Sequence, residues 1–234
     1  MDPKPLFLFC APQLATELLE CAAVFSRHHG FEVTVCLSTR SVAKSRRWRA
    51  AVRPWLSTSL GYSFRVKRID DVNRESFLAS VPVGANGIVH FWNQIFDVRA
   101  IQRFSSLVNL HESLLPFYRG PTPLYWIIAN RETTGGSTLH RVTSKIDGGE
   151  ILYQDAWRMY GRFSPRALHD RNRPGIRRAF VSWLEHLYDH RPYVSRTVDA
   201  AACYRHRADY LRRPPKRSIK ASSAELRTLQ ARHP

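Results

Sequence analysis

Short hydrophobic runs alternate with segments of helical periodicity over the first two-thirds of the chain. Contiguous apolar residues predict buried strands at 6–11, 87–92 and 107–110, and the segments 31–37 and 62–69 are predicted to be further strands. Apolar residues at helical spacing predict helices at 13–29, 41–56, 72–81 and 98–104, with Gly30 ending the first of them. Strands that alternate with helices in this way predict a mostly parallel sheet flanked by helices, a Rossmann-like α/β fold.

The pattern changes after Gly135. Two further strands are predicted at 137–142 and 150–158, joined by a polar turn. A long helical stretch follows at 166–190, and Pro174–Gly175 predicts that it is divided into two helices or kinked. From residue 191 the chain is polar and basic, so we expect a catalytic domain over 1–190 and a short basic C-terminal extension over 191–234.

Charge and cysteine content indicate the kind of ligand and the cellular compartment. The chain has 36 basic and 19 acidic side chains, a formal charge of +17, which favours anionic ligands such as nucleic acid or phosphorylated small molecules. Simple solvation of these charges is the alternative. The four cysteines form no CxxC pair, and no apolar run reaches the roughly 20 residues of a membrane span. A reduced, cytoplasmic protein without a structural metal is therefore expected.

Three polar residues stand where chemistry is expected in such a fold. Asn109 and His111 end a predicted strand, two positions apart and so on one face, and Asp147 follows 36 residues after His111 in the polar turn. An amide donor, an imidazole and a carboxylate together suit acyl transfer, since they can stabilise an oxyanion and handle an amine's protons. Taken singly, each is more often a cap or a turn residue.

The segment from Asn109 to Gln154 resembles the folate-dependent formyltransferases. Three motifs match in order: NLHESLLP, then YRGP, then IDGGEI. This superfamily includes methionyl-tRNA formyltransferase, glycinamide ribonucleotide transformylase and the sugar N-formyltransferases. The resemblance implies that Asn109, His111 and Asp147 are the catalytic residues. Asn109 would bind the formyl oxygen, His111 would stabilise the oxyanion or assist proton transfer, and Asp147 would set the protonation of His111.

The resemblance also implies a donor site for 10-formyltetrahydrofolate. The loop that follows the strand at 87–92 is similar to the family's pterin-binding loop, and the turn at 142–147 is similar to its second folate loop. The expected cofactor-binding residues are Phe91, Trp92, Asn93, Gln94, Ile95, Val142 and Ile146. Phe91, Trp92 and Asn93 are bulkier than the small, glycine-containing version usual in the family.

Glu112, Ser113, Tyr118 and Arg119 are the expected acceptor-binding residues. Tyr118 and Arg119 would shape the cleft, and Arg119 would meet an acidic group of the acceptor. Glu112 stands where the family usually has a small residue or proline. Its carboxylate either influences His111 or contacts the acceptor amine, or else it is simply exposed to solvent. His90, His140 and His169 are interpreted as structural.

The resemblance leaves several acceptor classes, and the length of the chain after the long helix helps to distinguish them. Only some 44 residues follow the long helix, too few for the C-terminal barrel of the tRNA enzyme, so the resemblance favours a nucleotide-linked amino sugar. Acceptors that stay open are aminoacyl-tRNA, which the basic runs Arg40–Arg53 and Tyr204–Lys220 would suit, and another small amine. A homodimer is also open. A binding module that has kept the fold without the chemistry is a further alternative, against which the intact trio argues.

Overall fold

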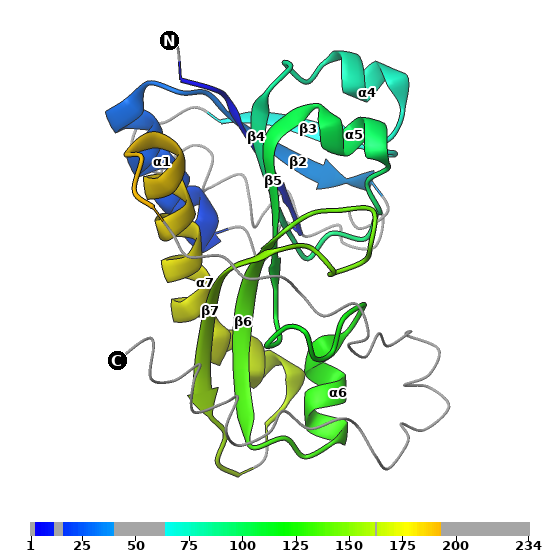
Figure 1. The fold of residues 1–234 in the computed structure, drawn as a ribbon, viewed down its shortest axis with the longest axis vertical. Helices are drawn as coiled ribbons and strands as arrows, with labels where there is room; N and C mark the ends of the chain where they lie inside the picture. The colour runs from blue at the N-terminus through cyan, green and yellow to red at the C-terminus, as the bar shows by residue number, and fades with distance from the viewer. Residues whose placement is uncertain (1–2, 12–15, 40–63, 162, 193–234) are drawn as a thin grey trace. The chain divides into compact units, whose positions relative to one another are not determined.

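The computed structural model describes residues 3–11, 16–39, 64–161 and 163–192 (Figure 1). Its strands follow the order β3-β2-β1-β4-β5-β6-β7. The chain divides into two compact units, Met1–Asn109 with Leu184–His190 and Leu110–Trp183 with Arg191–Pro234. The boundary cuts strand β5 (Phe104–His111) and helix α7 (Pro165–Tyr188), and each unit is described by itself.

The first unit is built on parallel strands. Strand β1 (Leu6–Cys10) pairs with β2 (Val33–Ser38) and with β4 (Ala85–His90), and β2 pairs with β3 (Arg65–Ile69), all in parallel. Every residue of β1, β2 and β4 is buried, as contiguous apolar runs predict, whereas the charged edge strand β3 is largely exposed. Figure 1 shows α1 (Thr16–His29) on one side of these strands, and α4 (Glu75–Ala79) and α5 (Val98–Gln102) on the other.

Aromatic rings fill the core of the first unit. The Phe9 ring meets the rings of Phe77, Trp92, Phe96 and Phe104 edge-on, with centroids 5.0–6.0 Å apart. Such edge-to-face pairs contribute about 0.5–1.5 kcal/mol each beyond the area that they bury. This cluster anchors the segment that follows β4, since Trp92 and Phe96 both belong to it.

The last turn of α7 belongs to the first unit. Tyr188 stacks on Phe31 with ring centroids 4.1 Å apart, and its hydroxyl donates to the Lys4 carbonyl oxygen at 2.9 Å. His29 Nε2 lies 3.0 Å from a carboxylate oxygen of Asp189. These contacts hold the end of α7 against the residues that precede β1 and β2.

The second unit contains an antiparallel hairpin and two helices. Strands β6 (Thr134–Arg141) and β7 (Ile151–Arg158) pair with one register shift between Leu139 and His140. Trp126 of α6 (Pro123–Ala129) is fully buried in a cluster with Leu124, Ile127 and Leu168. The register shift lies at the end of β6 that leads into the turn carrying Asp147.

Helix α7 corrects one prediction. It runs unbroken from Pro165 to Tyr188 with Pro174 inside it, so the alternative of two separate helices is wrong, and the alternative of a kink stays a prediction. Gly175 is needed because a β-carbon there would overlap the carboxylate of Asp155. Burial of Ile176, Phe180 and Trp183 offsets the roughly 3 kcal/mol that an interior proline costs a helix.

The predicted α/β fold with a mostly parallel sheet is confirmed. All strands predicted within the described residues form, although β5 and β6 begin three residues earlier than expected, and α6 was not predicted. The predicted helix at 41–56 and nearly all of the basic extension lie outside the described residues, so the division at residue 190 stays a prediction.

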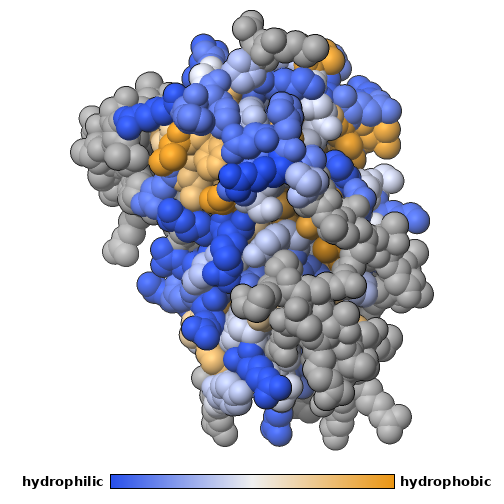
Figure 2. Space-filling view, turned by 60° about the vertical axis from the view of Figure 1, so that its left-hand side comes forward, coloured by the Kyte–Doolittle hydropathy of each residue, from blue (hydrophilic) through white to orange (hydrophobic). Residues whose placement is uncertain are grey.

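The face in Figure 2 is largely hydrophilic, with small separate hydrophobic areas. Among the described residues, no helix combines the length and apolar character that crossing a membrane requires.

Candidate active site

Asp147 is the carboxylate around which the polar groups of the second unit gather. It lies in the turn between β6 and β7 with a φ of 45°, in the left-handed region. Its Oδ2 lies 3.6 Å from His111 Nδ1 and accepts a hydrogen bond of 2.7 Å from the Gly120 backbone N–H. Its Oδ1 lies 3.4 Å from His140 Nε2. The carboxylate is thus bracketed by two imidazoles and one backbone donor.

These neighbours decide the charge of Asp147. Burial by itself raises the pKa of the carboxyl, but His111, the hydrogen bond from His140 and the Gly120 N–H all favour the charged form. The favourable contacts outweigh burial and hold the pKa of Asp147 well below its usual range. Asp147 is therefore a carboxylate throughout the neutral range.

His111 is buried, and both of its ring nitrogens face acceptors. Nε2 lies 2.8 Å from the Tyr118 carbonyl oxygen, and Nδ1 faces the Asp147 carboxylate. Because a carbonyl oxygen can only accept, Nε2 carries a hydrogen in this arrangement. A second hydrogen on Nδ1 would point at the carboxylate, so the site suits an imidazole that takes up a proton during reaction.

Arg119 is buried and holds the turn that carries Asp147. Its Nε and Nη2 donate to the Ile146 carbonyl oxygen at 3.0 and 2.6 Å. The guanidinium thereby fixes the residue directly before Asp147. Its expected contact with an acidic group of the acceptor stays a prediction.

Glu112 is buried, so the alternative that it is solvent-exposed is wrong. Its Oε1 lies 2.7 Å from Nδ1 of His169 on α7, whose side chain is only partly buried. The physical reason is this partner, 57 residues further along the chain, which makes burial of the charge tolerable. Ser113 is fully buried and its hydroxyl donates to the Phe117 carbonyl oxygen at 2.9 Å.

Asn109 belongs to the first unit. It lies on β5 two residues before His111 and is partly buried. Alternation along a strand places the two side chains on the same face. Its predicted contact with a formyl oxygen stays a prediction.

The loop predicted to bind pterin follows β4 in the first unit, at the switch point of strand order beside β1. Asn93 accepts from the Ser38 hydroxyl at 2.9 Å, and Gln94 donates to that hydroxyl at 3.2 Å and accepts from the Val72 N–H at 2.9 Å. Asn73 donates to the Ile95 carbonyl oxygen at 2.9 Å. The loop is thus held by residues at or just after the ends of β2 and β3.

The hydrophobic members of the predicted folate residues differ in exposure. Phe91 and Ile95 are 40% and 65% exposed, whereas the Trp92 ring packs on Phe9. Val142 and Ile146 are partly buried and belong to the second unit. Exposed apolar side chains beside a fixed loop suit an aromatic ligand.

His140 also lies beside Asp147, a contact that was not predicted. It is buried, and its Nε2 lies 3.4 Å from Oδ1 of Asp147, the carboxylate oxygen that His111 does not face. Its interpretation as a structural residue stays a prediction. No group of three or more candidate ligands suited to a metal ion occurs within residues 3–11, 16–39, 64–161 and 163–192.

The formyl transferase family model matches residues 57–183, more than half of the chain. The chain belongs to this family. The matched residues include the segment after β5, the turn that carries Asp147 and most of α7. The resemblance carried by the NLHESLLP, YRGP and IDGGEI motifs is thereby confirmed.

Other proteins are similar to this chain in part of the sequence or in fold. The bifunctional polymyxin resistance protein ArnA of Wigglesworthia glossinidia brevipalpis is 45% identical over 73 residues, which make up 31% of this chain and only 11% of that protein. A sugar N-formyltransferase from Shewanella sp. FDAARGOS_354 has a TM-score of 0.70 at 17% identity, over 90% of this chain and 79% of that one. An N-formyltransferase from Helicobacter canadensis, solved with folinic acid and dTDP-3-aminofucose, has a TM-score of 0.65 at 18% identity, over 88% and 72%.

Proposed function

We propose that this formyl transferase moves a formyl group from 10-formyltetrahydrofolate to the primary amine of a nucleotide-linked amino sugar. The observation that carries the proposal is the contact of His111 with Asp147, in a turn where Gly120 also donates to the carboxylate. This arrangement offers an imidazole whose positive charge a buried carboxylate stabilises. Such a group is what acyl transfer to an amine requires.

The reaction follows from these groups. The acceptor amine attacks the formyl carbon and forms a tetrahedral intermediate with a negative oxygen. The Asn109 amide would donate to that oxygen, and the positive charge of a protonated His111 would stabilise it through space, because both ring nitrogens face other acceptors. The Asp147 carboxylate would stabilise the charge on His111. The intermediate then collapses by breaking the carbon–nitrogen bond to folate. The amine loses one proton and the departing folate nitrogen gains one, so atoms and charge balance.

The choice of donor and acceptor is supported by similar proteins. The Helicobacter canadensis enzyme is described in complex with folinic acid and dTDP-3-aminofucose, and several other structural neighbours are named sugar N-formyltransferases. The formal charge of +17 suits a diphosphate-bearing acceptor. Because this charge also suits aminoacyl-tRNA, tRNA belongs in the test.

Calorimetric titration tests the proposal. The protein is titrated with a stable folate analogue alone, and then with a panel of nucleotide-linked amino sugars and bulk tRNA. We expect folate binding that a nucleotide-linked amino sugar strengthens. Salt-sensitive tRNA binding without a response to nucleotide sugars would replace the acceptor, and the absence of folate binding in every condition would overturn the function.

A variant separates enzyme from binding module. His111→Ala should abolish formyl transfer while the protein remains folded and still binds the folate analogue. His190→Ala is the matched control, because His190 is exposed and lies at the end of the first unit, away from Asp147 in the sequence. Full activity of His111→Ala would contradict the proposed role of this residue.

A further inference from the structure

Three consecutive residues after β5, Tyr118 to Gly120, contact both His111 and the turn that carries Asp147. The Tyr118 carbonyl oxygen accepts from His111 Nε2, the Arg119 guanidinium donates to the Ile146 carbonyl oxygen, and the Gly120 N–H donates to Asp147. Tyr118 and Gly120 make their contacts through backbone atoms. The positions of His111 and Asp147 therefore depend on the backbone conformation of the segment 118–120.

That conformation is a costly one. Tyr118 has a φ of 57° and Gly120 a φ of 95°, both in the region where side chains are disfavoured. Glycine accepts such angles freely, but tyrosine does not. Something outside the backbone must therefore hold Tyr118 in place.

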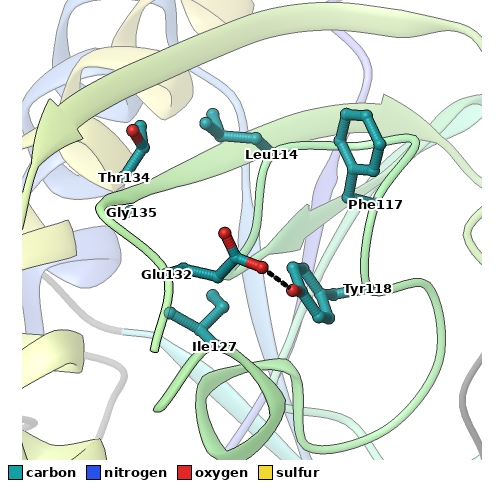
Figure 3. A pocket seen from close by; sticks show the side chains of 7 residues that line it. All are labelled: Leu114, Phe117, Tyr118, Ile127, Glu132, Thr134 and Gly135. Atoms are coloured by element: carbon teal, nitrogen blue, oxygen red, sulfur yellow. Dashed lines mark hydrogen bonds between the residues drawn. The ribbon is translucent and has the colours of Figure 1, made fainter. Parts of the chain in front are cut away.

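The Tyr118 side chain supplies this anchor. Its hydroxyl donates to a carboxylate oxygen of Glu132, and Asn130 Nδ2 donates to the same hydroxyl at 3.1 Å. Figure 3 shows the Tyr118 ring directed at Glu132 across a pocket that is otherwise mainly apolar. Leu114, Phe117 and Ile127 line this pocket, together with Thr134 and Gly135.

Resting on the proposed function, we propose that Glu132 and Asn130 are positioning residues for the reaction, acting on His111 and Asp147 through Tyr118. Both lie just after helix α6, and their side chains are hydrogen-bonded to the Tyr118 hydroxyl. When the hydroxyl loses its acceptor, Tyr118 can relax toward negative φ. Its carbonyl oxygen then turns away from His111, and the Gly120 N–H turns away from Asp147.

The variants are Tyr118→Phe, Glu132→Ala and Glu132→Gln. Tyr118→Phe removes one oxygen atom, and Glu132→Ala removes the acceptor. In Glu132→Gln the amide oxygen can still accept from the hydroxyl, so this variant should rescue the anchor. Tyr160→Phe is the matched control, because Tyr160 is 76% exposed.

The first readout is the nitrogen-15 NMR signal of the His111 ring in the free protein, assigned with His111→Asn. It needs neither folate nor acceptor. We expect the His111 signals to move in Tyr118→Phe and Glu132→Ala, and to stay at wild-type positions in Glu132→Gln and Tyr160→Phe. Should Glu132→Ala fail to fold, Tyr118→Phe decides. Wild-type signals in folded Tyr118→Phe would overturn the proposal.

The second readout is steady-state kinetics. We expect kcat to fall by roughly 10- to 100-fold in Tyr118→Phe and Glu132→Ala, since a small displacement of reacting groups lowers the rate more than binding. In Glu132→Ala, which leaves Tyr118 itself unchanged, KM for both substrates should stay within about 2-fold. If the wild type transfers no formyl group but the NMR signals move as expected, the proposed function fails and the positioning contact stands. If the wild type is active and the signals do not move, the positioning contact fails alone.

Discussion

Replacing Asp147 with asparagine tests whether its charge, rather than its shape, serves catalysis. The amide oxygen of the new side chain would still accept from the Gly120 N–H, so the turn should keep its conformation. What is lost is the negative charge at 3.6 Å from His111 Nδ1 and 3.4 Å from His140 Nε2. At an effective dielectric constant of about 20, full charges at such distances interact by about 4–5 kcal/mol.

Only part of this energy appears in the barrier, because His111 gains its charge during the reaction and water penetrates an opened site. With about 3 kcal/mol lost from the transition state, kcat should fall roughly 100- to 200-fold. The assay is steady-state formyl transfer at saturating substrate, with Asp70→Asn as control, because Asp70 is about half exposed and pairs with Arg74 in an exposed ion pair. A fall of less than about 3-fold would refute the electrostatic argument.

The same variant predicts a pH dependence of stability. Because the folded-state pKa of Asp147 is depressed, its carboxylate stabilises the fold above the ordinary aspartate pKa of about 3.9. This stabilisation is lost as the pH falls through the depressed folded-state value. The difference in unfolding free energy between wild type and Asp147→Asn should therefore shrink as the pH is lowered from about 7 toward about 2, measured by urea denaturation. A difference that stays constant over this range would contradict the assignment of a depressed pKa.

Three further predictions concern stability. Glu112→Ala removes the acceptor of a part-buried bond of 2.7 Å and should cost about 1–3 kcal/mol in urea denaturation. Glu32→Ala breaks an equally short but exposed pair and should cost less than about 1 kcal/mol, so equal costs would contradict the burial argument. Gly149→Ala would place a β-carbon against the Arg141 carbonyl oxygen and should destabilise the protein by about 3 kcal/mol. An unchanged melting temperature would contradict this prediction, because it would show that the turn can move to accept the β-carbon without loss of stability. Burial raises the pKa of Tyr188 to about 12, so its neutral hydroxyl favours the folded state below about pH 10, and this contribution is lost as the pH rises toward 12. Tyr188→Phe should lack this loss. Identical dependence of the unfolding free energy on pH between about 10 and 12 in wild type and variant would refute the prediction.

The parts that the sequence predicted share a physical cause. Strands β1, β2 and β4 are buried on both faces, so their sequences are largely apolar and can be recognised without knowledge of their neighbours. Helix α6 was missed because it has only seven residues, too few for a period to stand out after the proline-rich turn. Pro174 predicted a break, but the buried face of α7 on both sides of it outweighs the local preference.

In the candidate site, too, some contacts could be predicted from the sequence and others could not. His111 and Asp147 could be paired in advance because the family motifs fix their spacing, and they do lie together. The contacts from the Tyr118 carbonyl and the Gly120 N–H could not be predicted, because backbone groups leave no mark in the sequence. Burial of Glu112 was equally hidden, since its partner lies 57 residues away.

The central claim is that His111 and Asp147 serve formyl transfer to an amine. It is tested most directly by incubating the protein with isotopically labelled 10-formyltetrahydrofolate and a panel of nucleotide-linked amino sugars, and by following each acceptor by mass spectrometry. The account predicts that one acceptor gains a single labelled formyl group with the wild type and with His190→Ala, and gains none with His111→Ala. Folate binding with no labelled product on any amine, or equal product with His111→Ala, would contradict it.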